Sequence, residues 1–423
     1  MQDVIERIKE RAILVGLGKD YVSFSGHDPF EELRLLVDTA GADVVGRITQ
    51  SRPEINPAYF IGRGKVDELR AEVEQNKANV VVFDSDLTPA QASNLEKMLA
   101  VKIIDRSGLI LDIFAQRART REAKTQVELA QLKYLLPRLT RQWTHLSRQQ
   151  GGIGIRGPGE TQLEVDRRRV RQRISHLTDV LKKIETRHST SRKKRLRCFK
   201  VALVGYTNTG KSTLLNALSG AGVPVENKLF KTLDSVTRQM RLDSSREILI
   251  SDTVGFIRNL PHDLIASFKS TLDDVRDADA LLHVVDINNP EWEKQIEVVA
   301  GVLSDLGVAE TETIFVFNKI DRISNPSLLN SLAGRYAKVV SVSGKYGQGV
   351  DVLKNLLIKT MMKDQCKFKL EFGPDDNRLM SDVYRYGTII ETHGNKDKVE
   401  LTFTIPRFLA DRLGLLNKDT ELI

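Results

Sequence analysis

Cysteine is scarce in this sequence, and long uncharged apolar runs are missing from it. Only two of the 423 residues are cysteines, Cys198 and Cys366, and neither has the spacing of a metal ligand. We therefore expect no disulfide framework and no cysteine metal site. Without a run of 18 uncharged apolar residues, the chain offers no candidate for a membrane-spanning helix. Its first residues carry charges where a signal peptide needs an apolar run. These absences predict a cytoplasmic protein.

The composition predicts a soluble globular protein with more than one domain. Hydrophobic residues make up 41% of the chain and charged residues 28%, which are ordinary proportions for a folded protein. A chain of 423 residues is too long for one ordinary hydrophobic core. Internal repeats and low-complexity tracts do not stand out. We expect roughly two to four domains.

Positive charge is concentrated in one segment. The net charge is +8, and residues 167–200 hold 14 Lys and Arg against two acidic residues, so this segment alone carries +12 and the rest of the chain sums to −4. A local basic stretch indicates a polyanionic partner, with nucleic acid ahead of a membrane surface. A solvated helix face followed by a charged linker is the alternative interpretation.

Short apolar runs alternate with helical stretches over residues 1–115, which we interpret as an N-terminal α/β domain with some parallel pairing. The stretch Gly62-Arg-Gly-Lys65 lacks the spacing of a phosphate-binding loop, so we expect a turn before a helix there rather than a second nucleotide site. Strands are expected at 12–16, 43–48, 80–84 and 101–105, and helices at 65–75 and 88–99.

Residues 116–190 have a heptad pattern instead. One apolar seam with three- and four-residue steps covers 129–146, and a second covers 163–184. The Gly-rich stretch 149–162 separates the two seams. We predict an antiparallel helical hairpin with a flexible Gly-rich tip, in a monomer; a homodimeric coiled coil is the rival interpretation. Pro137 should kink the first helix.

A basic linker is expected at 191–197, before the strand and helix alternation resumes at Cys198. The apolar runs that follow predict a doubly wound parallel sheet over 198–363. Three alternating strands after it predict a small C-terminal α+β domain at 364–423. The strands of the parallel sheet are expected at 200–204, 247–251, 280–285, 313–317 and 338–342.

A phosphate-binding loop is indicated at residues 205–212. The sequence there, Gly205-Tyr-Thr-Asn-Thr-Gly-Lys-Ser212, has the form G-x-x-x-x-G-K-[ST] and lies between an expected strand and an expected helix. In this arrangement the N–H groups of the loop and the helix N-terminus cradle phosphate. Lys211 would neutralise the β- and γ-phosphates, and the Ser212 hydroxyl would ligate Mg²⁺. The predicted phosphate-binding residues are Gly205, Tyr206, Thr207, Asn208, Thr209, Gly210, Lys211, Ser212 and Thr213.

Two later motifs favour GTP over ATP. Asn318-Lys-Ile-Asp321 has the form N-K-x-D and follows an expected strand. The Asp321 carboxylate can accept hydrogen bonds from the N1–H and 2-amino groups of guanine, which adenine lacks. Ser343-Gly-Lys345 should meet the guanine O6 through its backbone. The predicted base-binding residues are Asn318, Lys319, Ile320, Asp321, Ser343, Gly344 and Lys345.

Two further segments complete the expected nucleotide site. Asp252 would hold Mg²⁺ through water, and the Gly255 N–H would sense the γ-phosphate. Thr232 is our choice for the second Mg²⁺ hydroxyl, with Thr237 as its competitor. We expect a part in hydrolysis for Lys211, Asn208, Thr232 and Gly255. The two segments comprise Phe230, Lys231, Thr232, Leu233, Asp234, Asp252, Thr253, Val254 and Gly255.

One expected catalytic part is missing. Ras-like GTPases place a water-orienting Gln just after D-x-x-G, whereas this chain has Phe256 there, which can neither orient nor deprotonate water. We therefore expect a slow intrinsic turnover that a partner accelerates. Asn208 offers another route, because several P-loop GTPases with Asn at this position recruit K⁺ beside the phosphates; a structural hydrogen bond within the loop is the alternative. Arg258 could supply charge, but we expect it to be a surface residue.

Taken together, these motifs resemble the HflX family of translation-associated GTPases, within the Obg-like branch. The resemblance covers nearly the whole chain. The sequence departs from the family pattern at Lys231, Ser235 and Val236, where Ala, Pro and Thr are usual, and at Gly344, where Ala is usual. Besides the segments above, the resemblance rests on Leu260-Pro-His-Asp-Leu264, Tyr59-Phe-Ile-Gly-Arg-Gly-Lys65 and Gly157-Pro-Gly-Glu-Thr-Gln-Leu163.

The resemblance implies binding to the large ribosomal subunit, hydrolysis stimulated by it, and a role in splitting or rescuing ribosomes under stress. The basic hairpin fits this, because Arg156 and residues 167–173 could reach the phosphates of ribosomal RNA; a plain connector is the alternative for its tip. A GTP-gated binding module, which recruits a protein or RNA and uses hydrolysis only as a reset, is the competing hypothesis.

Overall fold

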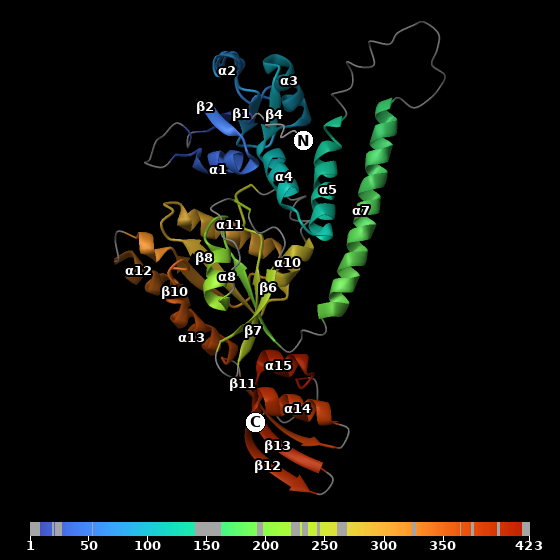
Figure 1. Ribbon diagram of the computed structural model, residues 1–423, viewed down its shortest axis with the longest axis vertical. Coiled ribbons are helices and arrows are strands. Elements are labelled where there is room, and N and C mark those ends of the chain that lie inside the picture. Colours follow the sequence, from blue (N-terminus) through green and yellow to red (C-terminus); the bar gives the residue numbers. More distant parts are fainter. Residues whose placement is uncertain are drawn as a thin grey trace, which may run out of the picture. The chain divides into compact units, whose positions relative to one another are not determined.

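The structure is a computed structural model and forms two compact units, each described by itself (Figure 1). The first unit comprises residues 1–185 together with 226–234 and 257–270, and the second holds the remaining residues. The described residues are 9–18, 21, 28–52, 54–139, 162–192, 198–220, 229–230, 236–242, 246–259, 269–323, 327–363, 365–373, 376–395 and 398–416.

A fully parallel sheet forms the core of the first unit. Its order is β2-β1-β3-β4, which confirms the expected parallel pairing. Strand β3 is buried along its whole length, as a strand covered on both faces should be. All four expected strands are present, as β1 (Arg11–Leu17), β2 (Asp43–Gln50), β3 (Val80–Phe83) and β4 (Lys102–Asp105).

Four helices alternate with these strands. The expected helices are present, and Gly62 precedes the first of them, as predicted for a turn before a helix. Thr88 and Gln91 form a capping box at the start of α3, which defines where this helix begins. Two helices that we did not predict, α1 and α4, complete the domain. The four are α1 (Glu31–Ala40), α2 (Arg63–Gln75), α3 (Pro89–Leu99) and α4 (Arg106–Arg117).

The middle region is helical, as expected. Helix α5 (Arg121–Leu135) packs on α4 and runs antiparallel to α7 (Gln162–Arg192) (Figure 1). The Arg173 guanidinium donates to both carboxylate oxygens of Glu128, at 2.7 and 3.0 Å, and so joins α7 to α5. The predicted tip lies outside the described residues.

The predicted kink at Pro137 is wrong in detail. Helix α5 ends at Leu135, and residues 136–138 form a turn. Proline lacks an N–H for the helical ladder, and the helix ends here although Leu136, the residue before the proline, keeps helical dihedral angles. Helix α5 therefore ends before Pro137.

A six-stranded sheet with the order β10-β9-β8-β5-β7-β6 lies at the centre of the second unit. Five of its strands pair in parallel, as predicted. The sixth, β6, pairs antiparallel with β7 at the edge; its sequence VTRQMR has too few apolar residues for us to have expected it. The strands are β5 (Phe199–Val204), β6 (Val236–Arg241), β7 (Glu247–Asp252), β8 (Ala280–Asp286), β9 (Thr313–Asn318) and β10 (Val339–Ser341).

Helices surround this sheet, and their apolar side chains complete its core. Leu214 and Leu218 of α8 and Leu353 and Leu357 of α13 are buried against the strands. The helices are α8 (Lys211–Ser219), α10 (Lys269–Arg276), α11 (Trp292–Asp305), α12 (Ser327–Arg335) and α13 (Val350–Met361), with a 3-10 turn at Ile320–Arg322.

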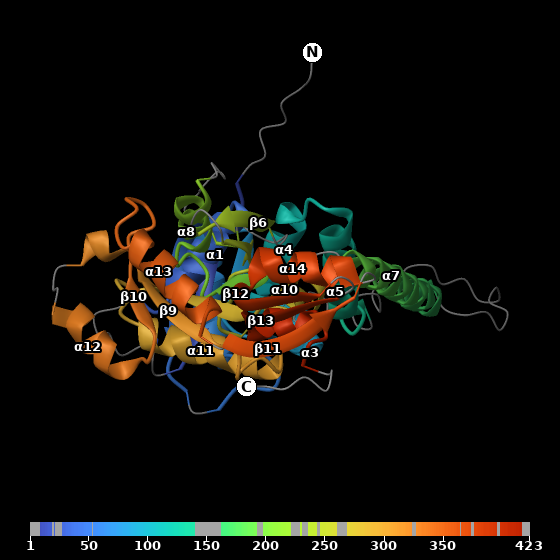
Figure 2. The same ribbon diagram turned by 90° about the horizontal axis from the view of Figure 1, so that it is seen from below.

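A small antiparallel sheet follows, as predicted for an α+β tail. Its order is β11-β13-β12, and two helices pack on it (Figure 2). Arg412 joins this sheet's helix α15 to the parallel sheet, since its guanidinium contacts both carboxylate oxygens of Asp279, at 2.7 and 2.8 Å. The elements are β11 (Gln365–Phe372), α14 (Asn377–Tyr386), β12 (Thr388–Asn395), β13 (Lys398–Pro406) and α15 (Arg407–Arg412).

Candidate functional site

The loop between β5 and α8 has the geometry of a phosphate cradle. Strand β5 ends at Val204, and α8 begins at Lys211. Gly210 has a φ of 92°, and a Cβ there would lie 2.4 Å from the Asn318 Nδ2. This position therefore requires glycine. The loop leads directly into the first turn of α8, and the N-terminus of a helix favours an anion.

Lys211 is buried within this loop. Its Nζ donates to the carbonyl oxygens of Gly205 and Tyr206, at 3.0 and 2.7 Å. Burial lowers the pKa of this ammonium group to about 8, although the Asp252 carboxylate opposes the shift. A phosphate group beside the ammonium would favour the charged form. The role of Lys211 at the β- and γ-phosphates stays a prediction.

Oxygen ligands suited to Mg²⁺ lie together beside the loop. The Ser212 hydroxyl donates to the Asp252 Oδ2 at 2.5 Å, and β5 and β7 pair so that Leu203 is opposite Asp252. A hydroxyl and a carboxylate are hard donors of the kind that Mg²⁺ takes together with water and phosphate. Among the described residues, no three acidic, His or Cys side chains form a metal cluster, so the nucleotide would have to complete this site.

The second predicted hydroxyl ligand cannot be placed. Lys231, Thr232, Leu233 and Asp234 lie outside the described residues. The competitor, Thr237, lies in β6, where its hydroxyl is 2.9 Å from the Ser251 hydroxyl. That contact engages Thr237 within the sheet.

Gly255 lies close against the phosphate loop. A Cβ on this residue would lie 2.9 Å from the Thr207 Cα and 3.0 Å from the Lys211 Nζ. The next residue is bonded to the loop on both sides: the Thr207 N–H donates to the Phe256 carbonyl at 2.7 Å, and the Phe256 N–H donates to the Gly205 carbonyl at 3.1 Å. Thr253 is buried and donates to the Leu203 carbonyl at 2.6 Å. Val254 is buried as well.

Asn318 connects the predicted base site to the phosphate loop. Its Nδ2 donates to the Thr209 carbonyl, and its Oδ1 accepts from the Gly344 N–H, both at 2.9 Å. The Ser343 hydroxyl donates to the Asp321 Oδ1 at 2.6 Å. The Asn318 amide therefore joins the N-K-x-D motif to the phosphate loop and to the segment Ser343-Gly-Lys345. Ile320 begins the 3-10 turn that carries Asp321.

Lys319 is held by a residue that we did not predict. Its Nζ lies 2.6 Å from the Asp286 Oδ2 and donates to the Asn208 carbonyl at 2.8 Å. Asp286 ends β8, and the carboxyl ends of parallel strands are where ligand sites form in such sheets. Its place at a strand end was the signal that could have identified it. The backbone of Asn208 has a positive φ of 61°.

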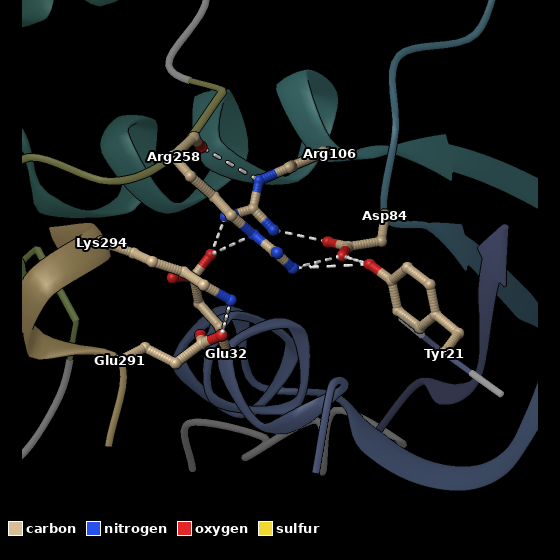
Figure 3. Close-up of polar contacts among 7 residues, drawn as sticks. All are labelled: Tyr21, Glu32, Asp84, Arg106, Arg258, Glu291 and Lys294. Carbon is tan, nitrogen blue, oxygen red and sulfur yellow. Dashed lines mark hydrogen bonds and ion pairs between the residues drawn. The ribbon is translucent and has the colours of Figure 1, made fainter. Parts of the chain in front are cut away.

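Arg258 differs most from expectation. Its side chain is 40% exposed, in keeping with the expected surface position, but it also pairs with Asp84 and Glu32 (Figure 3). Both partners come from the N-terminal α/β domain. The sequence did not reveal these partners, because no local pattern links positions so far apart in the chain.

The fold and this site define a P-loop GTPase. Residues 27–115, 117–195 and 200–319 match family models described as the N-terminal region of a GTP-binding GTPase, its middle region, and a 50S ribosome-binding GTPase. Among the described residues, no helix is both long enough and apolar enough to cross a membrane.

Two relatives show the particular family. The chain is 45% identical to the GTPase HflX of Caldanaerobacter subterraneus subsp. tengcongensis, over 97% of this chain and 94% of that protein. It is 42% identical to the GTPase HflX of Escherichia coli strain K12, over 98% and 97%. The chain belongs to the HflX family of GTPases, and it is a GTP hydrolase. A GTP-binding protein from Sulfolobus solfataricus, solved with GDP, is 24% identical over 83% of this chain and 98% of that chain, with a TM-score of 0.44.

Replacing Asp321 should change the base that the site prefers. In Asp321→Asn the amide can no longer accept two hydrogen bonds from guanine, so we expect the affinity for GTP to fall by at least about a hundredfold. Xanthosine triphosphate, which has a carbonyl in place of the 2-amino group, should gain affinity. Titration with both nucleotides measures the change. The exposed Asp351→Asn is the control, and an unchanged GTP affinity in Asp321→Asn would contradict the assignment.

Nucleotide binding should take up a proton at alkaline pH. The Lys211 pKa is lowered to about 8 in the free protein, and phosphate should raise it on binding. Above about pH 8, binding then restores the lost proton, and the affinity for GDP should fall by up to about tenfold per pH unit. Calorimetry at pH 8.5 in two buffers of different ionisation enthalpy measures this uptake. Equal binding enthalpies in both buffers would rule it out.

Proposed function

We propose that this GTPase is slow by itself, that the large ribosomal subunit and its RNA stimulate it, and that it acts in ribosome splitting or rescue under stress. Phe256 carries this proposal. It stands where a water-orienting Gln would stand, its side chain is 2% exposed, and both of its backbone polar groups are bonded to the phosphate loop. A phenyl ring cannot orient water. The missing catalytic group would have to come from a partner.

The basic face of α7 supports RNA as that partner. Arg169 and Arg171 are exposed on this helix, and guanidinium groups bind phosphate oxygens well. Arg173 is engaged with Glu128 instead. The matched family description, a 50S ribosome-binding GTPase, is consistent with this interpretation.

Several finer assignments belong to the same proposal. The roles given above to the phosphate, base and switch residues are part of it, with Ser212 and Thr232 as the Mg²⁺ ligands. Mg²⁺ would supply positive charge to the β- and γ-phosphates. We also propose a cytoplasmic monomer with the predicted five-part division at 1–115, 116–190, 191–197, 198–363 and 364–423.

A GTP-gated binding module is the second candidate. The same Phe256 fits a protein that hydrolyses slowly in order to keep its GTP-bound state long-lived. Such a protein would recruit another protein or RNA without mechanical work on ribosomes. The two candidates differ in whether large subunits accelerate hydrolysis.

Purified large subunits should raise the GTPase rate by at least about tenfold, since a group supplied by a partner lowers the barrier by more than about 1.4 kcal/mol. Steady-state phosphate release with and without subunits measures this. The variant Arg169→Ala/Arg171→Ala should need more subunit for the same effect and should show a weaker salt dependence. Arg70→Ala, on another exposed helix face, is the matched control.

No stimulation by large subunits would refute the ribosome-dependent function and favour the binding module. Deleting residues 149–162 should abolish splitting and spare GTP binding. If the deletion leaves splitting unchanged, the tip is only a connector.

Potassium should accelerate hydrolysis relative to sodium at equal ionic strength, if Asn208 helps to hold a K⁺ ion beside the phosphates. In Asn208→Gly, which tolerates the positive φ at this position, the advantage of potassium should disappear. GTPase rates in matched KCl and NaCl buffers measure the effect. Equal rates for the unmodified chain would leave Asn208 with a structural role alone.

A further inference from the structure

The loop after β8 holds two polar side chains to which the proposed function gives no role. Asp286 ends this strand and lies opposite Asn318 in the register of β8 with β9. Asn288 follows two residues later. We call residues 286–289 the β8 loop. It lies at the carboxyl ends of two parallel strands, beside the N-K-x-D motif.

The β8 loop bonds to both the side chain and the backbone of Lys319. The Lys319 Nζ donates to the Asp286 Oδ2 at 2.6 Å, and the Asn288 Nδ2 donates to the Lys319 carbonyl oxygen at 2.8 Å. A third contact joins the two backbones, since the Ile287 N–H donates to the Asn318 carbonyl oxygen at 3.4 Å. The Asp286 and Lys319 side chains are only 18% and 19% exposed. Solvent ions therefore screen this pair less than a pair on the open surface.

The Asp286 carboxylate also organises the β8 loop itself. Its Oδ1 accepts from the Asn288 N–H at 3.1 Å, which closes an Asx turn, while its Oδ2 accepts from Lys319. The Asn289 N–H donates to the Asp286 carbonyl oxygen at 3.1 Å. Loss of the carboxylate would therefore release the Lys319 side chain directly and would loosen the turn that places Asn288.

Lys319 needs this support because its backbone is left-handed. Its φ is 65° and its ψ is 32°, a conformation in which the Cβ crowds the following carbonyl oxygen. Such a conformation persists where the surrounding contacts over-determine it. Lys319 also stands between Asn318, which bonds to the phosphate loop, and the 3-10 turn that carries Asp321. Its conformation therefore sets the direction in which the chain runs from Asn318 to Asp321.

We propose that Asp286 and Asn288 are positioning residues for guanine recognition. They hold Lys319 in its left-handed conformation, so that the Asp321 carboxylate meets the N1–H and 2-amino groups of the base. The proposal rests on the base-binding roles proposed for Asp321 and Lys319. The Ser343 hydroxyl holds the Asp321 side chain, and the β8 loop holds the backbone that leads to it.

Discrimination between GDP and inosine diphosphate measures this positioning. The inosine nucleotide lacks only the 2-amino group, so the ratio of its dissociation constant to that of GDP reports the bond from that group to Asp321. A hydrogen bond to a charged group should make this ratio at least about tenfold in the unmodified chain. In Asp286→Ala we expect the ratio to fall by at least about threefold. Asn288→Ala removes the carbonyl contact but keeps the ion pair, and it should cause a smaller fall.

Glu312→Ala is the matched control. Glu312 directly precedes β9, at the opposite end from Asn318, and its carboxylate pairs with Lys338 at 2.8 Å and with Lys363 at 3.1 Å. Its removal should lower the unfolding temperature and leave the ratio unchanged. Asp286→Asn keeps an oxygen acceptor without its charge, so its ratio should lie between those of Asp286→Ala and the unmodified chain.

A double-mutant cycle separates positioning from a merely structural role. Glycine adopts the left-handed conformation without a steric penalty, and in Lys319→Gly the side chain that Asp286 holds is gone. In that background Asp286→Ala should change the ratio by less than about twofold. A carboxylate that only stabilises the fold would lower the unfolding temperature in both backgrounds without changing the ratio in either.

Calorimetric titration of the full chain with each diphosphate, without ribosomes, tests this, and thermal unfolding of the nucleotide-free chain accompanies it. An unchanged ratio in Asp286→Ala would overturn the proposal, and so would an equal fall in Glu312→Ala. An unchanged ratio in Asp321→Asn would refute the base assignment and the positioning proposal with it. If only Asp321→Asn lowers the ratio, the base site stands and the positioning proposal alone fails. Ribosomal stimulation does not enter this assay, so its failure would be seen separately.

Discussion

Two backbone hydrogen bonds join Phe256 to the phosphate-binding loop, and the arrangement of the nucleotide site depends on them. They hold the residue after Gly255 beside Gly205 and Thr207. The pairing of β5 with β7 brings Asp252 to Ser212 in the same way. Backbone hydrogen bonds tolerate side-chain change, so this contact persists although Phe stands in the place of Gln. The site therefore keeps its geometry while it loses a group that would orient water.

The base site is connected to the phosphate loop by side chains rather than by backbone pairing. Asn318 bonds to Thr209 and to Gly344, and Lys319 reaches Asn208 and Asp286. These hydrogen bonds join the two loops, so a substitution at Asn318 or Lys319 would also remove a contact with the phosphate loop.

Residues of the two predicted switch segments make their contacts with the N-terminal α/β domain. Phe230 packs on Phe114 of α4, and Arg258 donates to Asp84, in the unit that contains the N-terminal sheet.

The sequence alone determined the parallel sheets, the nucleotide loops and the guanine motif, because strand hydrophobicity and loop chemistry are encoded within a few consecutive residues. It did not reveal β6, a polar edge strand recognisable only by its partner β7, nor the engagement of Lys319 by Asp286. The pairing of Asp84 with Arg258 is the clearest case. Asp84 and Arg258 are 174 positions apart, and each is an ordinary charged residue in its own surroundings. Only tertiary structure brings them together, since burying one charge is favourable only where the fold supplies the opposite one.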